Sequence, residues 1–439
     1  MNYGDYLSES GSKRRPSPLR RFSRIGREST RPLINMSPGL PNNDLCHFIG
    51  AKFHLRDGST LELSEEDCKV AYNYGNADGI KPLLAFLSDL TVNVHQPPTY
   101  KDNDTEKQLR VMVNPGGCHG ISSVAGLILS PGSLCLVQER SYPTFIEAIR
   151  CIGATPLGIK MEEDGPNMSH FKELLSAWDP NDEDKWATRP KLFYLVPNGN
   201  NPSGETVSLE KKREIYALAQ KYDFIILEDD AYYFMHYDGP SIPSFLSMDV
   251  DGRVIRCDSF AKILGAGYRL GWISGPNALV TRLLYHLQVD CQHSSLLSQV
   301  LFSRQFQQWG IDGFLRHTDT TREFYKQRRD IIAKAAEDHL TGLATWSVPR
   351  AGLFMWMKLL TIRDAEEFLL DQVLKNDVLL TPGIIFLMDQ SQPSSYIRVA
   401  FSVGPEENLA KGLKILAETI REFNKTSKDE TTIEGNQKG

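Results

Sequence analysis

Short apolar segments alternate with a helical pattern through the middle of the chain. Residues 192–196 (LFYLV) have the composition of a buried strand that ends at Pro197. A helix is predicted after Ser208, because apolar residues recur at positions 215, 218, 219 and 222. Further strands are predicted at residues 224–227, 254–256 and 272–274. Strands separated by a helix predict an α/β fold with a mostly parallel sheet and helices on both of its faces.

Polar clusters follow three of these predicted strands. They lie at residues 198–201 (NGNN), 229–230 (DD) and 259–262 (SFAK). In sheets of this kind, ligands bind in the crevice beyond the carboxyl ends of the strands. We therefore expect the three clusters to converge on one binding site.

The pattern changes near residue 320 to long amphipathic helices around a few strands, at residues 352–358 and 396–401. This change predicts a smaller C-terminal domain, joined to the first by a long helix in the region 319–336. We expect residues 1–41 to form an N-terminal arm that packs with the small domain or with a partner chain. The large domain is expected over residues 42–320, the small domain over 321–425 and a polar, flexible tail over 426–439.

Composition and charge exclude several classes of protein. The 439 residues are 41% hydrophobic and 24% charged, which is typical of a globular protein. The net charge of −6 gives no reason to expect a nucleic acid or an anionic membrane as a partner. No apolar run approaches the ~20 residues that span a bilayer. The seven cysteines are scattered without a C-x-x-C pair, so we expect reduced thiols and no metal site.

The first 31 residues are rich in arginine and serine, as mitochondrial transit peptides are. Transit peptides are poor in acidic residues, however, and Asp5, Glu9 and Glu28 occur here. We therefore expect a mature arm and a cytoplasmic rather than a mitochondrial location.

A lysine and an arginine flank a glycine-containing turn after one of the predicted strands. Ser259 and Lys262 follow the strand, and Arg269 comes seven residues after the lysine, with Gly265 and Gly267 between them. The glycines allow a tight turn that brings the arginine back toward the serine. A hydroxyl and a guanidinium placed in this way can bind one phosphate group.

A carboxylate and two hydrogen-bonding groups precede this turn: Asp229, Tyr232 and Asn201. Pyridoxal 5′-phosphate requires such a set. A lysine forms an imine with its aldehyde, a carboxylate keeps its pyridine nitrogen protonated, and donors bind its phenolate oxygen. The sequence therefore predicts an enzyme that holds this cofactor on Lys262 and acts on the Cα of amino acids.

Four segments together resemble the fold-type I aminotransferases of class I and II: VPNGNNPSG, ILEDDAYYF, SFAKILGAGYRLGWISGP and SSYIRVAFS. The resemblance runs over almost the whole chain and is greatest to the subgroup that contains kynurenine/α-aminoadipate aminotransferase. It implies a large domain with a mostly parallel seven-stranded sheet and a smaller α+β C-terminal domain. It also implies a homodimer with shared active sites.

The resemblance assigns roles to individual residues. It makes Lys262 the residue that binds the cofactor and Asp229 the partner of the pyridine nitrogen. It assigns Asn201 and Tyr232 to the phenolate oxygen, Ser259 and Arg269 to the phosphate, and Tyr142 to stacking on the ring. It assigns Tyr74 to the phosphate of the neighbouring subunit, and Arg398, together with Asn201, to the substrate α-carboxylate. Gly39 and Arg20 are assigned to the border of the substrate pocket.

The chain departs from the family pattern at the phosphate loop. Residues 113–120 read VNPGGCHG, where relatives have Ser/Thr-x-Gly-Ser/Ala-Gln. The backbone N–H groups of Gly117 and Cys118 can still hold a phosphate at a helix start. Pro38 replaces a glycine near the pocket, and Ala261 and Ala266 replace a common serine and proline. These changes indicate a looser phosphate cup and an altered substrate preference.

The predicted reaction is transfer of an amino group between an L-amino acid, aromatic or aminoadipate- or kynurenine-like, and a 2-oxo acid. A C–S β-lyase acting on cysteine conjugates in fungal sulfur-containing secondary metabolism is the alternative. A regulator built on an inactive aminotransferase is disfavoured because the short arm cannot hold a helix-turn-helix. A dinucleotide-dependent oxidoreductase is disfavoured because the glycines at 116, 117 and 120 do not fit G-x-G-x-x-G. No role is assigned to His119 or His236.

Overall fold

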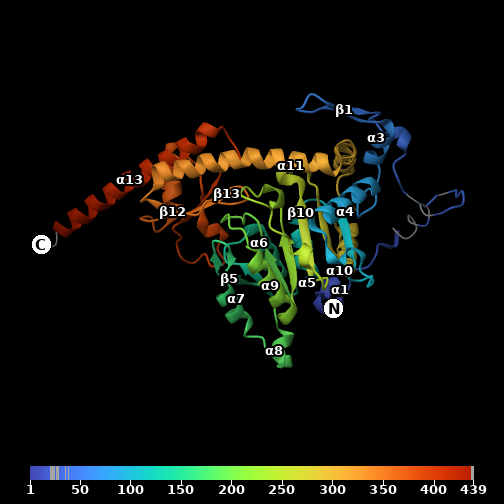
Figure 1. Cartoon of the computed structure of the whole chain (residues 1–439), viewed down its shortest axis with the longest axis horizontal. Helices are drawn as coiled ribbons and strands as arrows, with labels where there is room; N and C mark the ends of the chain where they lie inside the picture. The colour runs from blue at the N-terminus through green and yellow to red at the C-terminus, as the bar shows by residue number, and fades with distance from the viewer. Residues whose placement is uncertain (20–24, 26–28, 35, 38, 437–439) are drawn as a thin grey trace.

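A seven-stranded sheet forms the centre of the large domain (Figure 1). The computed structural model describes residues 1–436 except 20–24, 26–28, 35 and 38. The strand order is β3-β11-β10-β9-β8-β4-β5, and β11 alone runs antiparallel to its neighbours within this sheet. The prediction of a mostly parallel seven-stranded sheet is therefore confirmed. The strands are β3 (Leu109–Asn114), β4 (Leu134–Gln138), β5 (Thr155–Ile159), β8 (Leu192–Leu195), β9 (Ile225–Asp229), β10 (Val254–Ser259) and β11 (Gly271–Pro276).

Helices cover both faces of this sheet, because successive side chains of each strand point to opposite faces. Leu192 and Tyr194 of β8 join the core beneath α5, α6 and α10, whereas Phe193 and Leu195 join the core beneath α7 and α9. The helices of this domain are α3 (Glu65–Tyr72), α4 (Lys81–His95), α5 (Gly117–Ile128), α6 (Pro143–Ile152), α7 (Met168–Leu175), α8 (Glu183–Ala187), α9 (Leu209–Tyr222) and α10 (Asn277–Asp290).

The helix predicted after Ser208 is α9. The Ser208 hydroxyl caps it by accepting from the Lys211 backbone N–H at 3.4 Å. The strand predicted at 192–196 is β8, and the strands predicted at 224–227, 254–256 and 272–274 are β9, β10 and β11. Apolar periodicity thus located the elements around the carboxyl end of the sheet.

The long helix α11 (Leu296–Leu340) crosses from the large domain to the C-terminal part of the chain (Figure 1). Its path changes at Gly310, where φ is +61°. The domain boundary predicted near residue 320 falls within this helix. Beyond it lie β12 (Ala344–Trp346), β13 (Phe354–Leu359), α12 (Ala365–Phe368), a π-helical turn (Leu369–Val373), β14 (Thr381–Pro382), β15 (Tyr396–Ala400) and α13 (Glu406–Asn436).

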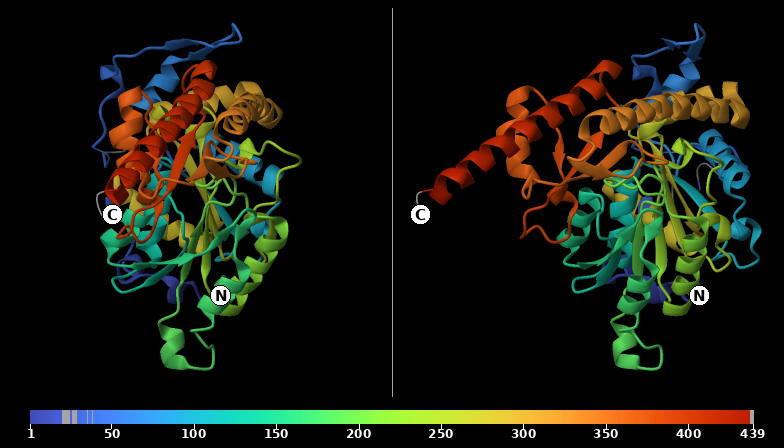
Figure 2. Two further views of the ribbon diagram at one scale, coloured as in Figure 1. Left: turned by 90° about the vertical axis from the view of Figure 1, so that its left-hand side faces the viewer. Right: turned by 60° about the vertical axis from the view of Figure 1, so that its left-hand side comes forward.

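The C-terminal strands form a four-stranded sheet in the order β12-β13-β15-β14, with antiparallel pairs. Helix α13 lies against α11 and then projects away from the rest of the molecule (Figure 2). The polar stretch that the sequence predicted as a tail from residue 426 is helical through Asn436, because it continues α13 without a break.

The first residues of the chain, 3–8, pack against the large domain and not against the small domain, whereas packing of the arm on a partner chain stays a prediction. Tyr3 and Tyr6 are buried in the core that contains α5 and α10. The Tyr3 hydroxyl donates to the Gly252 carbonyl at 3.0 Å, and the Ser8 N–H donates to the Leu127 carbonyl at 2.8 Å. Two buried aromatic rings with satisfied polar groups account for this docking.

Two short antiparallel ribbons complete the fold. The strands β1 (Ala51–His54) and β2 (Thr60–Leu63) pair beside α3, at one extremity of the molecule (Figure 1). The strands β6 (Met161–Glu162) and β7 (Gly165–Pro166) form the second ribbon. No helix in the described part of the chain has the length and apolarity needed to cross a bilayer.

Candidate active site

Lys262 lies at the carboxyl end of the central sheet, in the 3-10 helix Phe260–Lys262 that follows β10. Burial lowers the pKa of its amine. Cys118 and Asp229 act in the opposite direction, and the positive charges of Arg398 and Arg269 lower the pKa further. The four groups that change this pKa therefore come from distant parts of the chain and lie near the amine. A lysine with a lowered pKa has more of the neutral, nucleophilic form at neutral pH.

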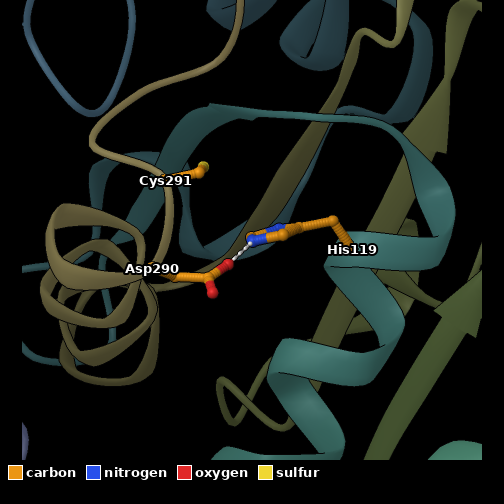
Figure 3. A group of neighbouring side chains, drawn as sticks. All are labelled: His119, Asp290 and Cys291. Carbon is orange, nitrogen blue, oxygen red and sulfur yellow. Dashed lines mark hydrogen bonds and ion pairs between the residues drawn. The ribbon is translucent and has the colours of Figure 1, made fainter.

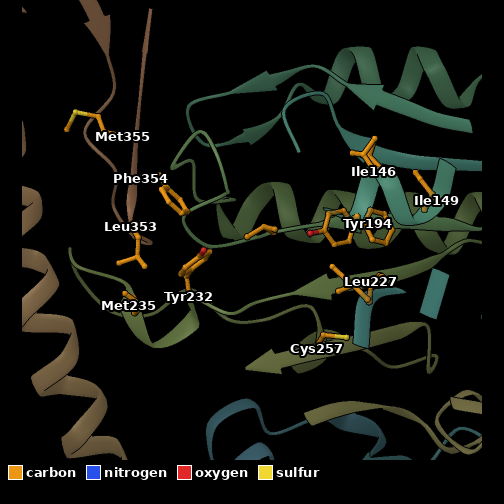
Figure 4. Close-up of a cluster of buried hydrophobic side chains, with 14 of the residues drawn as sticks. Ile146, Ile149, Tyr194, Leu227, Tyr232, Met235, Cys257, Leu353, Phe354 and Met355 are labelled. Atoms are coloured by element: carbon orange, nitrogen blue, oxygen red, sulfur yellow. The ribbon is translucent and has the colours of Figure 1, made fainter. Parts of the chain in front are cut away.

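Asp229 ends β9 and is buried. Its Oδ2 accepts a hydrogen bond from the Tyr194 hydroxyl at 2.8 Å. Burial raises the pKa of this carboxyl to about 6, against the opposing effect of the Tyr194 hydrogen bond. Figure 4 shows the Tyr194 hydroxyl directed along β8 toward the end of the sheet at which Tyr232 and Phe354 lie. A buried carboxylate held in this way is suited to bind a protonated ring nitrogen.

Two glycines at the start of α5 face Ser259 and Arg269. An ideal Cβ built on Gly116 would lie 2.9 Å from Nη2 of Arg269, and one built on Gly117 would lie 3.9 Å from the Ser259 Cβ. Gly116 has a φ of +103°, a conformation that favours glycine. The backbone N–H groups of a helix start, a hydroxyl and a guanidinium thus converge. This combination of groups is suited to bind phosphate, even though the loop departs from the pattern expected from the resemblance.

Cys118 follows directly in the first turn of α5. Its side chain is exposed, and its Sγ lies 3.4 Å from the Tyr142 hydroxyl. Tyr142 precedes α6 and is half-buried, and burial followed by the neighbouring Cys118 raises the pKa of its phenol. The thiol and the phenol therefore lie side by side at the start of α5.

Arg398 of β15 extends across to the large domain. Its Nη1 donates to Oδ1 of Asn201 at 2.8 Å, and its guanidinium carbon lies 4.3 Å and 4.8 Å from the ring centres of Phe354 and Phe386. Its buried Nε has no hydrogen-bond partner among the residues that the structure describes, and burial lowers the pKa of the side chain. Two aromatic faces fix the plane of the guanidinium, which suits bidentate binding of a carboxylate.

Tyr232 completes the group at the sheet end. It is buried, and its ring lies edge-on to Phe354 with 6.2 Å between ring centres. Burial and then the nearby Asp229 raise the pKa of its phenol, so the hydroxyl keeps its proton and can donate it in a hydrogen bond.

Two residues assigned from the resemblance, Tyr74 and Gly39, lie away from this group in the described part of the chain. Tyr74 is 58% exposed, and its ring lies against that of His293 at 6.0 Å between centres. Gly39 is exposed, and a Cβ built on it would have no atom within 4 Å. Arg20 lies outside the described residues. The structure of one chain therefore does not bring Gly39 to the pocket, and Tyr74 faces outward.

A buried ionic network lies behind the site, and sequence reasoning did not find it. Arg256 is fully buried and contacts Glu228, Asp230 and Asp258 at 3.2, 2.9 and 2.8 Å. Asp230 also accepts from Asn198 at 2.9 Å, so this buried carboxylate has partners on two other segments of the chain. Arg256 and Asp258 share one face of β10, and Arg256 lies opposite Glu228 of β9. Charged residues at alternate positions of otherwise apolar strands are the sequence feature that could have revealed this network.

Tyr194 was also missed as a functional residue, because its strand reads as apolar. The sequence feature that could have revealed it was the hydroxyl itself, since a buried tyrosine hydroxyl needs a hydrogen-bond partner. Asp229 is that partner.

Comparison with known proteins agrees with this geometry. The model of the family "Aminotransferase class I and II" matches residues 50–416. The kynurenine/alpha-aminoadipate aminotransferase, mitochondrial, of Bos taurus is 39% identical over 423 residues, which cover 96% of this chain and 100% of the relative. The aromatic amino acid aminotransferase C569.07 of Schizosaccharomyces pombe is 29% identical, over 96% of this chain and 98% of the relative.

Solved structures are similar in fold. The crystal structure of aminotransferase Aro8 from Candida albicans superimposes with a TM-score of 0.84 at 26% identity, over 96% of this chain and 98% of that one. Since the family model covers most of the chain and the bovine relative is matched over its whole length, the protein belongs to the class I and II aminotransferases.

Proposed function

We propose that this aminotransferase binds pyridoxal 5′-phosphate through Lys262 and uses L-amino acids with aromatic, kynurenine-like or aminoadipate-like side chains. The single observation that carries the proposal is the convergence of Lys262, Asp229 and the Gly116–Arg269 contact at one end of the sheet. That cofactor requires an amine for its aldehyde, a carboxylate for its pyridine nitrogen and a cup for its phosphate, and these groups meet the three requirements in that order.

The residues present fit the cofactor. Asp229 would bind the ring nitrogen, and Asn201 and Tyr232 would bind the phenolate oxygen. Gly117, Cys118, Ser259 and Arg269 would hold the phosphate, and Tyr142 would stack on the ring. When bound, the cofactor supplies an electron-accepting ring that stabilises negative charge at the substrate Cα.

The protein groups then orient the substrate and move its protons. Arg398 binds the α-carboxylate with its fork of N–H groups, and its bond to Asn201 fixes the direction of that fork. Lys262 takes a proton from the substrate Cα, because its lowered pKa makes the neutral amine available as a base. The same groups act in reverse on the 2-oxo acid that accepts the amino group.

An apolar wall beside Arg398 supports an aromatic substrate side chain. Phe354 and Phe386 flank the guanidinium, and Trp356 lies edge-on to Phe386 at 5.9 Å between ring centres. Aromatic rings favour such edge-to-face contacts. The names of the bovine and fission-yeast relatives support the same substrate classes.

We propose a homodimer in which Tyr74 contributes to the neighbouring site. Large apolar side chains are exposed near the N-terminal segment and the β1–β2 ribbon, which is unusual for a surface that stays in water. They include Ile34, Met36, Leu45, Phe48 and Ile49. A second copy of the chain that covers this surface would place Tyr74, now 58% exposed, against its partner. Sedimentation analysis of the holoprotein tests the dimer, and a monomer would contradict it.

The decisive experiment follows the cofactor absorbance of purified protein. Adding an amino acid alone should convert the imine band to that of the amine form of the cofactor, and a 2-oxo acid should restore it. Lys262→Ala should abolish both the band and turnover. Release of thiol and ammonia from a cysteine conjugate, without any 2-oxo acid, would support the C–S lyase and contradict transamination as the main activity.

The cytoplasmic location also remains our proposal, although the bovine relative carries a mitochondrial name. The tagged full-length chain should show cytosolic fluorescence. Import of this chain into mitochondria would overturn the proposal.

A further inference from the structure

Three potential metal ligands meet behind the phosphate loop. His119 lies in the first turn of α5, while Asp290 and Cys291 lie at the end of α10 (Figure 3). The imidazole nitrogen, the carboxylate oxygen and the thiol sulfur all lie within 4.8 Å of one another. Nε2 of His119 is 2.9 Å from Oδ2 of Asp290.

We propose that His119, Asp290 and Cys291 bind a divalent transition-metal ion of the zinc type, with water as the fourth ligand. Zinc prefers nitrogen, sulfur and carboxylate ligands at about 2.0–2.3 Å in a tetrahedral arrangement. Ligand atoms around one such ion lie closer together than 4.8 Å, the distance within which the nitrogen, oxygen and sulfur atoms lie here. Modest side-chain rotations therefore suffice to close the site. The ion would replace the proton shared between imidazole and carboxylate.

The local backbone explains how two consecutive residues can bind one ion. Successive side chains of a helix point about 100° apart. Cys291 is the C-cap of α10, with φ −134° and ψ 12°, so the chain has left the helix at this residue. Figure 3 shows Asp290 and Cys291 side by side at this helix end, with His119 opposite on α5. The C-terminal end of a helix also carries partial negative charge, which favours a cation.

A simple ion pair between His119 and Asp290 does not require the thiol. Cys291 is what distinguishes the cluster, because its sulfur lies within 4.8 Å of both the imidazole nitrogen and the carboxylate oxygen. A bound metal would hold this sulfur in its deprotonated form. The other ionisable groups nearby are His286, whose ring stacks on His119 at 6.3 Å between centres, and Arg14, which lowers the pKa of His286.

The place of His119 in the chain implies a structural role for the bound ion. His119 follows the phosphate-loop residues Gly117 and Cys118 directly. Binding would therefore tie the first turn of α5 to the end of α10. The sequence predicted no metal site, because His119 is separated by 171 residues from Asp290.

Zinc titration of metal-free holoprotein, with unbound cofactor removed, tests the proposal. Calorimetry should show one Zn²⁺ per chain. Cys291→Ser and His119→Asn should each weaken binding at least about tenfold, the lower end of the effect of disturbing a metal site. Cys151→Ser is the matched control, since it removes another exposed thiol and should leave the affinity unchanged.

Cobalt substitution provides an independent readout. Co²⁺ bound to the wild-type protein should show the intense visible d–d bands of a tetrahedral site, and these should be lost in Cys291→Ser. The cofactor absorbance of each variant shows that it is folded. Absence of saturable zinc binding, or binding that persists unchanged in both ligand variants, would overturn the proposal.

Discussion

Tyr194 and Asp229 are held together across neighbouring strands by a 2.8 Å hydrogen bond within the core of the sheet. The ring of Tyr194 is fully buried and stacks on Phe145 with 3.7 Å between centres, so its hydroxyl has a fixed position. The bond lowers the pKa of a carboxyl that burial raises to about 6. Tyr194 is thus a positioning residue that keeps Asp229 ionised near neutral pH.

Tyr194→Phe should move the acid limb of the pH profile of kcat/KM to higher pH. Loss of the hydrogen bond removes an effect that lowers the pKa of Asp229, so the carboxyl binds a proton at a higher pH. A hydrogen bond to a charged group contributes about 1.5–3 kcal/mol, so we expect activity at pH 7 to fall by about tenfold or more. Steady-state kinetics between acidic and alkaline pH measure both effects.

Tyr216→Phe is the matched control for that variant. Tyr216 is another buried tyrosine that donates to a buried aspartate, Asp249, at 3.0 Å, but it lies on α9 away from the site. This variant should lose stability without any shift of the pH profile. Equal profiles for Tyr194→Phe and wild type would show that the tyrosine has only a structural role.

Gly116→Ala should weaken binding of pyridoxal 5′-phosphate. The added methyl group would lie 2.9 Å from Nη2 of Arg269, inside the space where the phosphate is expected, and the φ of +103° is unfavourable for alanine. We expect a loss of about 1–3 kcal/mol, the range of strain at such positions, which corresponds to an affinity weaker by about five- to 150-fold. Fluorescence titration of apoprotein with the cofactor measures the affinity.

Backbone strain alone is tested by Gly404→Ala. Gly404 has a φ of +80°, and its Cβ would have no atom within 4 Å. This variant should lose stability but retain cofactor affinity. If both glycine variants bind the cofactor as tightly as wild type, the contact between Gly116 and Arg269 does not form part of the phosphate cup.

Arg398→Lys should raise the KM for the amino acid and for the 2-oxo acid together, because both carry the carboxylate that the guanidinium is proposed to bind. Lysine cannot form the bidentate fork, nor keep the planar contact with Phe354 and Phe386. A loss of about 2–3 kcal/mol, typical of a hydrogen-bonded charged pair, corresponds to about a 30- to 150-fold decrease in kcat/KM. A change confined to one of the two substrates would contradict this role.

Much of the fold and of the site could be predicted because they depend on local patterns. The apolar run at 192–196 and the helix after Ser208 follow the periods of strand and helix. The residues at the strand ends, including Asn201, Asp229 and Lys262, were expected to converge because parallel strands share one carboxyl edge. The structure brings them together.

The remainder depends on contacts between distant segments. The docking of Tyr3 and Tyr6 on the large domain has no local signal, because an aromatic residue near a chain end can pack against several surfaces. The burial of Asp230 also depends on distant segments. Its partner Arg256 lies 26 residues later on the neighbouring strand and makes the burial of this carboxylate favourable.

Arg256→Met should destabilise the protein more than any substitution in an exposed ion pair. The side chain compensates Glu228, Asp230 and Asp258 in the buried network, and its removal leaves these carboxylates without their cation. Breaking a buried pair costs about 3–5 kcal/mol, which urea unfolding should detect. Burial already raises the pKa of Asp258 to about 7, and loss of the guanidinium that opposes this effect should raise it further, so the loss of stability should grow as the pH rises through 7 and shrink below it. Arg322→Met, which removes an exposed pair with Asp319, should cost less than about 1 kcal/mol at every pH. Equal losses of unfolding free energy in the two variants would show that Arg256 does not compensate the charges of the buried carboxylates.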